Sequence, residues 1–386
     1  MQTKKLWEIC GFQNGFAFKS HEYVENWFFV MRIKNVQDWY INLNDPQYIS
    51  KDRKNEFEKF ILQEWDILMS LTGNIWRAGV VKKEHLPALL NQRVAKISIK
   101  DETILDQKYL FSFFNSSEFS ELVCSLGSWA AQQNIGLSTI ANLEIPLPPL
   151  ATQHAIAEKL DKLQSLIDLK KQAITKTDEL AKSIFLEMFG DPMVNEKDWE
   201  VKKLKEIWRL ASWWTPSRWT PAFFTWTIPW ITTVSLWKTF ISRENAVEYI
   251  TEEAIKNSAT KLVPKNSILI WTRVWVWKVS INVDDISYNQ DITWITEIDK
   301  SLNLLFFREF LSYKSASYND VKRWATIQWI TSDVIKNTNV YIPPLPLQQK
   351  FADIITQIES TKEKNKQALA KLEELYQATM QRSFSL

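Results

Sequence analysis

The chain has 386 residues, and its 47 basic and 45 acidic side chains give a net charge of +2. This length predicts two or three domains that need no disulfide bonds, and the only two cysteines, Cys10 and Cys124, favour a reducing, cytoplasmic setting. The near-neutral charge excludes a general polycation but not binding through local basic patches. Neither a membrane span of about 18 apolar residues nor a signal peptide is predicted.

Residues 1–149 are predicted to form a mixed α/β domain, because short apolar runs rich in β-branched and aromatic residues alternate with amphipathic stretches. The expected elements are strands at Phe28–Ile33, Ile67–Leu71 and Val94–Ile99 and helices at Gln107–Asn115 and Ser116–Leu126.

A long helix is predicted over residues 150–190. Prolines at positions 146, 148 and 149 prevent an earlier start, and Gly190 followed by Pro192 is a stop signal. Apolar side chains recur along it at alternating spacings of three and four residues, as in the seam of a coiled coil. The seam residues expected to pack against another helix are Ile156, Leu160, Leu163, Ile167, Ile174 and Ile184.

Residues 196–343 are predicted to form a second mixed α/β domain. Its expected elements are strands at Ile228–Ile231, Ser267–Ile270 and Val279–Val283 and a helix at Leu304–Ser312.

A second long helix, residues 345–386, follows another group of prolines. We expect the two long helices to pack on each other, because helices in proteins are stabilised mainly by burying an apolar face. The packing residues expected on this helix are Phe351, Ile355, Ile358, Leu369 and Leu372.

The two halves repeat one pattern. The segment Ile145-Pro-Leu-Pro-Pro-Leu-Ala-Thr-Gln153 resembles Ile342-Pro-Pro-Leu-Pro-Leu-Gln348, and the two glutamines are 195 residues apart. The same offset pairs Trp129-Ala130 with Trp324-Ala325. The chain is therefore predicted to contain two copies of one unit, each a globular segment followed by a long helix.

Tryptophan and glycine occur in abnormal numbers, 20 and 7. About 7% of an average chain is glycine, which would be about 27 residues here and equals the two counts together. Ser212-Trp213-Trp214-Thr215-Pro216-Ser217 is typical of a turn that needs glycine, and Trp65-Asp66 precedes an apolar run as Gly-Asp turns do. Our hypothesis is that 18 of these tryptophans, all but Trp199 and Trp230, are glycines encoded by UGA codons.

No motif for catalysis or metal binding stands out. The chain lacks the glycine-rich phosphate loop, and His21, His85 and His154 are far apart and expected at the surface. With two distant cysteines they give no zinc-site spacing. Asn44-Asp-Pro-Gln-Tyr48 is faintly similar to the Asp-Pro-Pro-Tyr tetrapeptide of adenine methyltransferases, but it lacks the second proline, and a plain turn is favoured.

Several motifs in combination resemble the specificity subunit of type I restriction-modification systems. Besides the duplicated proline-rich motif, they are Asn14-Gly-Phe-Ala-Phe-Lys-Ser20, Leu71-Thr-Gly-Asn-Ile75, Thr215-Pro-Ser-Arg218, Ile228-Pro-Trp-Ile231, Asn289-Gln-Asp-Ile-Thr293 and Arg323-Trp-Ala-Thr-Ile-Gln-Trp-Ile-Thr331. The resemblance covers essentially the whole chain. Its main departure is the tryptophans, with glycine expected at Trp324 and Trp329.

The resemblance implies a subunit that has no catalytic site and no cofactor of its own. Each half would contain a target recognition domain that reads one part of a split sequence in double-stranded DNA, and the long helices would pair antiparallel and separate the domains. Two modification subunits would methylate adenine with S-adenosylmethionine. Restriction subunits would use ATP and Mg²⁺ to translocate and cut DNA, and no membrane is implied.

Base edges in DNA are read by arginine, lysine, asparagine and glutamine, so these residue types on predicted loops are the candidates for DNA binding. They are Asn74, Arg77, Gln132, Gln133, Asn134, Arg218, Arg273, Lys278, Arg323 and Gln328. Those at equivalent places in both halves could instead contact phosphate or hold loops, because residues that read different bases should differ.

Two other classes of protein stay open from the sequence. One is a self-contained DNA methyltransferase or nuclease, against which the missing cofactor and phosphate motifs count. The other is a tryptophan-rich carbohydrate or single-strand binder, which requires that the tryptophans be genuine.

Overall fold

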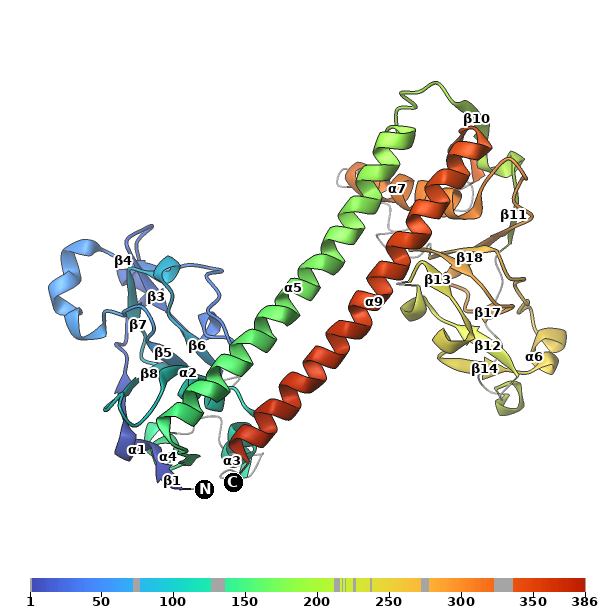
Figure 1. Ribbon diagram of the computed structural model, residues 1–386. Coiled ribbons are helices and arrows are strands. Elements are labelled where there is room, and N and C mark those ends of the chain that lie inside the picture. The colour runs from blue at the N-terminus through green and yellow to red at the C-terminus, as the bar shows by residue number, and fades with distance from the viewer. Residues whose placement is uncertain are drawn as a thin grey trace. The chain divides into compact units, whose positions relative to one another are not determined.

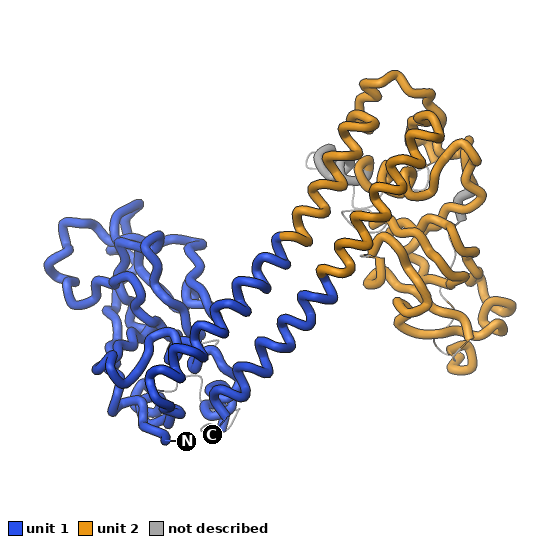
Figure 2. Tube along the Cα trace, in the orientation of Figure 1, with its two compact units in different colours: residues 1–172, 366–386 blue, residues 173–365 orange. Residues whose placement is uncertain are grey.

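The structure is a computed structural model that describes residues 2–71, 77–125, 136–211, 216, 218, 220–224, 227–236, 238–271, 278–322 and 336–385. It divides into two compact units, coloured separately in Figure 2. The first comprises residues 1–172 and 366–386, and the second comprises residues 173–365. Each unit thus contains one globular segment and part of both long helices.

The first unit is built on three sheets. Their strands are β1 (Thr3–Lys5), β2 (Cys10–Asn14), β3 (Phe28–Met31), β4 (Tyr48–Ile49), β5 (Ile67–Ser70), β6 (Ala78–Val80), β7 (Ala88–Leu90), β8 (Val94–Ile99) and β9 (Glu144–Pro146). In the described part of this unit the sheet orders are β2–β8–β5–β6, β4–β3–β7 and β1–β9. The β1–β9 pair is antiparallel and joins the two ends of the globular segment just before the first long helix begins.

The second unit repeats these sheets. Its strands are β10 (Glu200–Lys203), β11 (Arg209–Ala211), β12 (Ile228–Ile231), β13 (Phe240–Ile241), β14 (Glu248–Ile250), β15 (Ile268–Trp271), β16 (Val279–Asn282), β17 (Ser287–Tyr288), β18 (Ile292–Thr296) and β19 (Asn339–Ile342). Among the described residues their orders are β11–β18–β15–β16–β13, β14–β12–β17 and β10–β19. The larger sheet matches that of the first unit and adds β13, which pairs parallel with β16.

Shorter helices pack around these sheets. They are α1 (Leu6–Ile9), α2 (Gln107–Phe114), α3 (Ser117–Ser125) and α4 (Leu137–Ala141) in the first unit and α6 (Glu252–Asn257) and α7 (Leu304–Lys322) in the second. Two boundaries predicted from the sequence were wrong. β3 stops at Met31 because a 3-10 turn follows over Ile33–Asn35. α7 runs past Ser312, and buried Lys314 within it donates to the Pro192 carbonyl oxygen at 2.8 Å.

The long helices are α5 (Leu150–Phe189) and α9 (Leu345–Phe384), each of 40 residues (Figure 1). α5 ends as the sequence predicts, because Gly190 has a left-handed φ of 77° and its N–H donates to the Leu186 carbonyl oxygen at 2.9 Å. Within each unit the helices run antiparallel. Lys171 and Glu373 form an ion pair of 3.1 Å in the first unit, and Lys362 pairs with Asp178 in the second.

The helix ends complete the two cores. In the first unit Leu160, Leu163 and Ile167 of α5 are buried with Met380 and Phe384 of α9. Leu369 and Leu372 contact the same cluster, as does Ile156.

In the second unit Phe351 and Ile355 of α9 are buried with Phe185 and Phe189 of α5. Ile184 and Ile358 pack against this cluster, and Ile174 is partly buried. Each such apolar side chain stabilises the fold by roughly 1.5–3 kcal/mol when fully buried.

A fully buried glutamine connects the start of α5 to its globular segment. The Gln153 side chain donates to the carbonyl oxygens of Ile104 at 2.9 Å and Pro148 at 2.8 Å, and its oxygen accepts from the backbone N–H of Asp106 at 2.8 Å. Asp106 is the N-cap of α2, accepting from the Tyr109 N–H at 2.8 Å. One side chain therefore holds three backbone groups from two segments.

Gln348 repeats this arrangement at the start of α9. It donates to the carbonyl oxygens of Ser301 at 2.9 Å and Pro343 at 2.7 Å, and it accepts from the Asn303 backbone N–H at 2.8 Å. Asn303 in turn caps α7, accepting from the Leu305 N–H at 2.9 Å. Leaving such buried backbone groups without partners costs about 1–3 kcal/mol each, so both glutamines are strongly constrained.

Among the described residues, three tryptophans have backbone angles that favour glycine. Trp27, Trp39 and Trp65 have φ values of 104°, 73° and 74°. The side chains of Trp27 and Trp65 are 55% and 53% exposed, whereas the Trp39 ring packs on Phe111 and Tyr376. A bulky residue with positive φ costs about 1–3 kcal/mol.

Candidate nucleic-acid interface

Three of the ten predicted DNA-binding residues lie in the described part of the chain, namely Arg77, Arg218 and Lys278. The other seven, Asn74, Gln132, Gln133, Asn134, Arg273, Arg323 and Gln328, lie outside the described residues.

Arg77 and Lys278 occupy equivalent positions in the two units. Each immediately precedes the second strand of a β-hairpin, β5–β6 in the first unit and β15–β16 in the second. Arg77 donates to the side-chain oxygen of Gln37, and its Nε lies 3.7 Å from the Asp38 carboxylate. Lys278 Nζ lies 4.9 Å from the ring centroid of Trp271, and burial lowers the pKa of this lysine.

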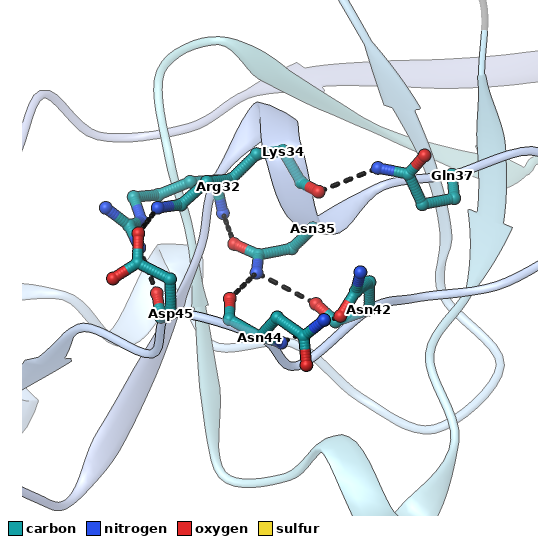
Figure 3. A network of polar contacts seen from close by, with 7 residues as sticks. All are labelled: Arg32, Lys34, Asn35, Gln37, Asn42, Asn44 and Asp45. Carbon is teal, nitrogen blue, oxygen red and sulfur yellow. Dashed lines mark hydrogen bonds and ion pairs between the residues drawn. The ribbon is translucent and has the colours of Figure 1, made fainter. Parts of the chain in front are cut away.

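The loop that contacts Arg77 is held by a polar network, shown in Figure 3. Asn35 is fully buried; its oxygen accepts from the Arg32 N–H at 3.0 Å, and its amide donates to the carbonyl oxygens of Asn42 at 2.8 Å and Asn44 at 3.3 Å. Asn35 therefore binds three backbone groups from inside the loop and holds the backbone of residues 32–44 in this conformation.

Two cations and one carboxylate close this loop. Arg32 donates to the backbone carbonyl of Asp45 and lies 3.5 Å from its carboxylate, and Lys34 pairs with the same carboxylate. Gln37 donates to the Lys34 carbonyl oxygen at 2.7 Å, which orients the amide that Arg77 contacts. Polar residues of two loops therefore meet at one edge of the first unit.

The residues of this loop were not among the sequence candidates. The clustering of Arg32, Lys34, Asn35 and Gln37 directly after an apolar strand is the signal that could have found them. The Asp45 carboxylate is engaged by Arg32 and Lys34, and Asp45 has a φ of 52°, which fits the plain turn favoured for this segment over a catalytic tetrapeptide.

Arg218 in the second unit is held by two contacts. Its Nη1 donates to the Glu248 carboxylate at 2.9 Å, and its guanidinium carbon lies 5.1 Å from the ring centroid of Phe224. The Arg218 side chain is 60% exposed. Solvent therefore weakens its ion pair with Glu248, and the guanidinium can leave Glu248 for another partner.

The histidines do not form a site. His85 is buried, and its Nδ1 accepts from the Lys82 backbone N–H at 2.9 Å, so the predicted surface position was wrong for His85, while His21 and His154 are exposed. No group of three or more His, Cys, Asp or Glu residues within the described ranges could hold a metal ion. Nor is any helix of the described part long and apolar enough to cross a membrane.

Comparison with known proteins explains the duplicated architecture. The family model for the type I restriction modification DNA specificity domain matches residues 1–177 and again residues 196–374. The specificity subunit of the type I restriction enzyme MjaVIII from Methanocaldococcus jannaschii is 30% identical over 187 residues, covering 47% of this chain and 44% of that protein. A putative MjaX specificity subunit of the same organism is 22% identical over 89% of this chain and 83% of its own length.

A solved structure has the same fold. The type I restriction-modification S subunit from M. genitalium is 13% identical, with a TM-score of 0.61 over 100% of this chain and 96% of that one. The chain spans only 44%, 33% and 42% of three curated relatives that it matches in sequence. Because the family model matches both halves and covers most of the chain, the protein belongs to the type I restriction modification DNA specificity domain family.

Proposed function

We propose that this chain is the DNA specificity subunit of a type I restriction-modification complex. Residues 1–149 and 196–343 would be two target recognition domains, each reading one part of a split site in double-stranded DNA. The observation that carries the proposal is the duplicated family match on two units with related sheets and different polar loops.

The chemistry would reside in partner subunits. Two modification subunits would bind this chain and methylate adenine with S-adenosylmethionine, and restriction subunits would supply ATP- and Mg²⁺-dependent cleavage. The described residues support a binding role, since Arg77, Arg218 and Lys278 are basic side chains that stand outside the strands and helices, and arginine and lysine are the residue types that most often contact DNA phosphates.

A reconstituted complex tests this proposal. The chain alone should transfer no methyl group, the modification subunits alone should show no sequence preference, and the two together should methylate one bipartite, asymmetric site. Methyl transfer by the isolated chain would instead support a self-contained methyltransferase. Binding to an oligosaccharide or to single strands in preference to duplex DNA would support the tryptophan-rich binder.

We further propose that glycine occupies positions 27, 39 and 65 in the functional protein. The left-handed φ values at these tryptophans support it, and so does the repeat, because Asn266 stands at the place equivalent to Trp65 and also has a positive φ, 64°. Asparagine tolerates this conformation, whereas tryptophan does not.

Tryptophans that we expect to be genuine and tryptophans that we expect to be glycine also differ in their hydrogen bonds. Trp199, predicted to be genuine, donates its indole N–H to the Phe189 carbonyl oxygen at 3.2 Å. The indole N–H groups of Trp208 and Trp294 are buried without a partner among the described residues. A genuine buried tryptophan usually has such a partner. The codons decide the matter, since TGG at positions 27, 39 and 65 would contradict the proposal and TGA would support it.

A further inference from the structure

The buried glutamine at the start of each long helix lies between that helix and the globular segment of the same unit. Gln153 uses both of its N–H donors and its oxygen on backbone groups, and Gln348 does the same at the equivalent place. Both side chains are 0% exposed. An amide whose donors and acceptor are all used in this way fits only one orientation of the two segments.

The backbone groups that Gln153 binds belong to two parts of the chain, and these two parts determine the direction in which α5 leaves the globular segment. Pro148 belongs to the turn before α5, while Ile104 and Asp106 belong to the loop that starts α2. Tyr109 of α2 reinforces the joint by donating its hydroxyl to the Pro146 carbonyl oxygen at 2.8 Å.

The rest of this joint is apolar and less directional. Leu160 and Leu163 of α5 pack with Phe113 of α2 in the common core. Apolar packing gives stability but tolerates small rotations, whereas hydrogen bonds to fixed backbone groups specify an angle.

We propose that Gln153 and Gln348 are positioning residues that fix the angle between each recognition domain and its long helix, and thereby set the length of the unread gap between the two DNA half-sites. This inference rests on the proposed function. Neither glutamine would contact DNA, so the sequences of the half-sites would not depend on them.

The test is Gln153→Met in the full chain, assembled with its modification subunits, because methionine keeps nearly the same shape and removes all three hydrogen bonds. The variant complex should methylate the same two half-sites but accept gaps one base pair longer or shorter, with the preference for the native gap reduced about tenfold. Gln348→Met should have the same effect. The matched control is Gln172→Met, the same exchange at an exposed position of α5, which should change nothing.

A distance measurement makes the test independent of methylation. The distance would be measured between two spin labels, one attached at Glu58→Cys in the globular segment and one at Leu169→Cys on α5. Both positions are exposed and lie in the first unit. Cys124 would be replaced by serine, and Cys10 would stay unlabelled because burial raises the pKa of its thiol to about 12. Gln153→Met should broaden the distance distribution, and Gln172→Met should not.

The outcomes separate the two proposals. An unbroadened distribution together with an unchanged gap preference in Gln153→Met would overturn the positioning role. If the unmodified complex methylates no bipartite site, the proposed function fails, while the distance distribution still decides whether the glutamine sets the angle. Should Gln153→Met not fold, Gln153→Asn takes its place, because its shorter amide cannot reach both segments and the same two results are expected.

Discussion

The β5–β6 hairpin of the first unit and the β15–β16 hairpin of the second have the same place in related sheets, yet their basic residues make different contacts. Arg77 is held by the amide of Gln37, whereas its counterpart Lys278 lies over position 271, where the tryptophan is one of those that our hypothesis replaces by glycine. The glutamine joints, by comparison, match bond for bond. The repeat thus preserves the groups that place backbone segments and varies those that face outward, as expected of two domains that read different sequences.

Truncating tryptophans should separate the genuine ones from those that stand where glycine belongs. Trp230 is 1% exposed in β12, so Trp230→Ala should cost about 3–5 kcal/mol of unfolding free energy. Trp65→Gly should instead stabilise the first unit by about 1 kcal/mol, because it relieves a positive φ and uncovers little apolar surface. Denaturant unfolding measures both values, and a loss of stability in Trp65→Gly would contradict the comparison.

The equivalent position in the second unit offers the reverse experiment. Asn266→Trp should destabilise that unit by about 1–2 kcal/mol, since it places a bulky side chain at a φ of 64°. Asn266→Gly is the control and should be nearly neutral. Equal stability of the tryptophan variant and the parent chain would show that these turns do not discriminate against bulky residues.

The two equivalent cations should each act on one half of the DNA site. Arg77→Ala and Lys278→Ala, measured as complexes, should each weaken DNA binding by about 1 kcal/mol. Scrambling the half-site read by the first domain should abolish the effect of Arg77→Ala and leave that of Lys278→Ala. If neither variant changes the affinity, the edge formed by these hairpins is not the DNA-binding surface.

Mild acid, from about pH 7 to about pH 5.5, should loosen the first unit slightly, whereas the second unit, residues 173–365, contains no histidine that would titrate in this range. Burial lowers the pKa of His85 from its ordinary value of 6.5, with Lys82 acting in the same direction and Glu84 against it. The unfolded chain then binds a proton more readily than the folded one, so this contribution to stability is present above pH 6.5 and is lost as the pH falls below it.

Hydrogen exchange of the two units as a function of pH measures this difference. The control is His85→Gln, which should flatten the pH dependence of the first unit. A loss of protection on acidification that is equal in both units would contradict the role of His85.

Much of the fold could be predicted from local signals in the sequence. Proline and glycine mark the ends of α5, and the alternating spacing of Leu160, Leu163 and Ile167 identifies its buried side. The length of α7 could not be predicted, because its polar end contains Lys314, whose burial depends on the distant Pro192 carbonyl.

Fewer residues of the candidate site could be predicted from the sequence. Gln153 and Gln348 identified the repeat, but two of the three partners of each glutamine come from a segment nearly fifty residues away, and these contacts appear only in the structure. The polar cluster after β3 signals a loop that could bind DNA, but the burial of Asn35 within it could not be predicted, because a buried loop asparagine and an exposed one look alike in a single sequence. Most of the residues predicted to read bases lie outside the described residues, so the structure does not test their positions.

Exchange of one half of the chain tests the central claim most directly. Residues 1–149 would be replaced by the corresponding segment of another family member, the complex would be assembled with its modification subunits, and methylated adenines would be mapped across a genome. If each unit reads its own part of the target, one half of the bipartite site changes, while the other half and the gap stay as they were. A change in both halves, or in neither, would contradict the claim that each unit reads its own part of the DNA target.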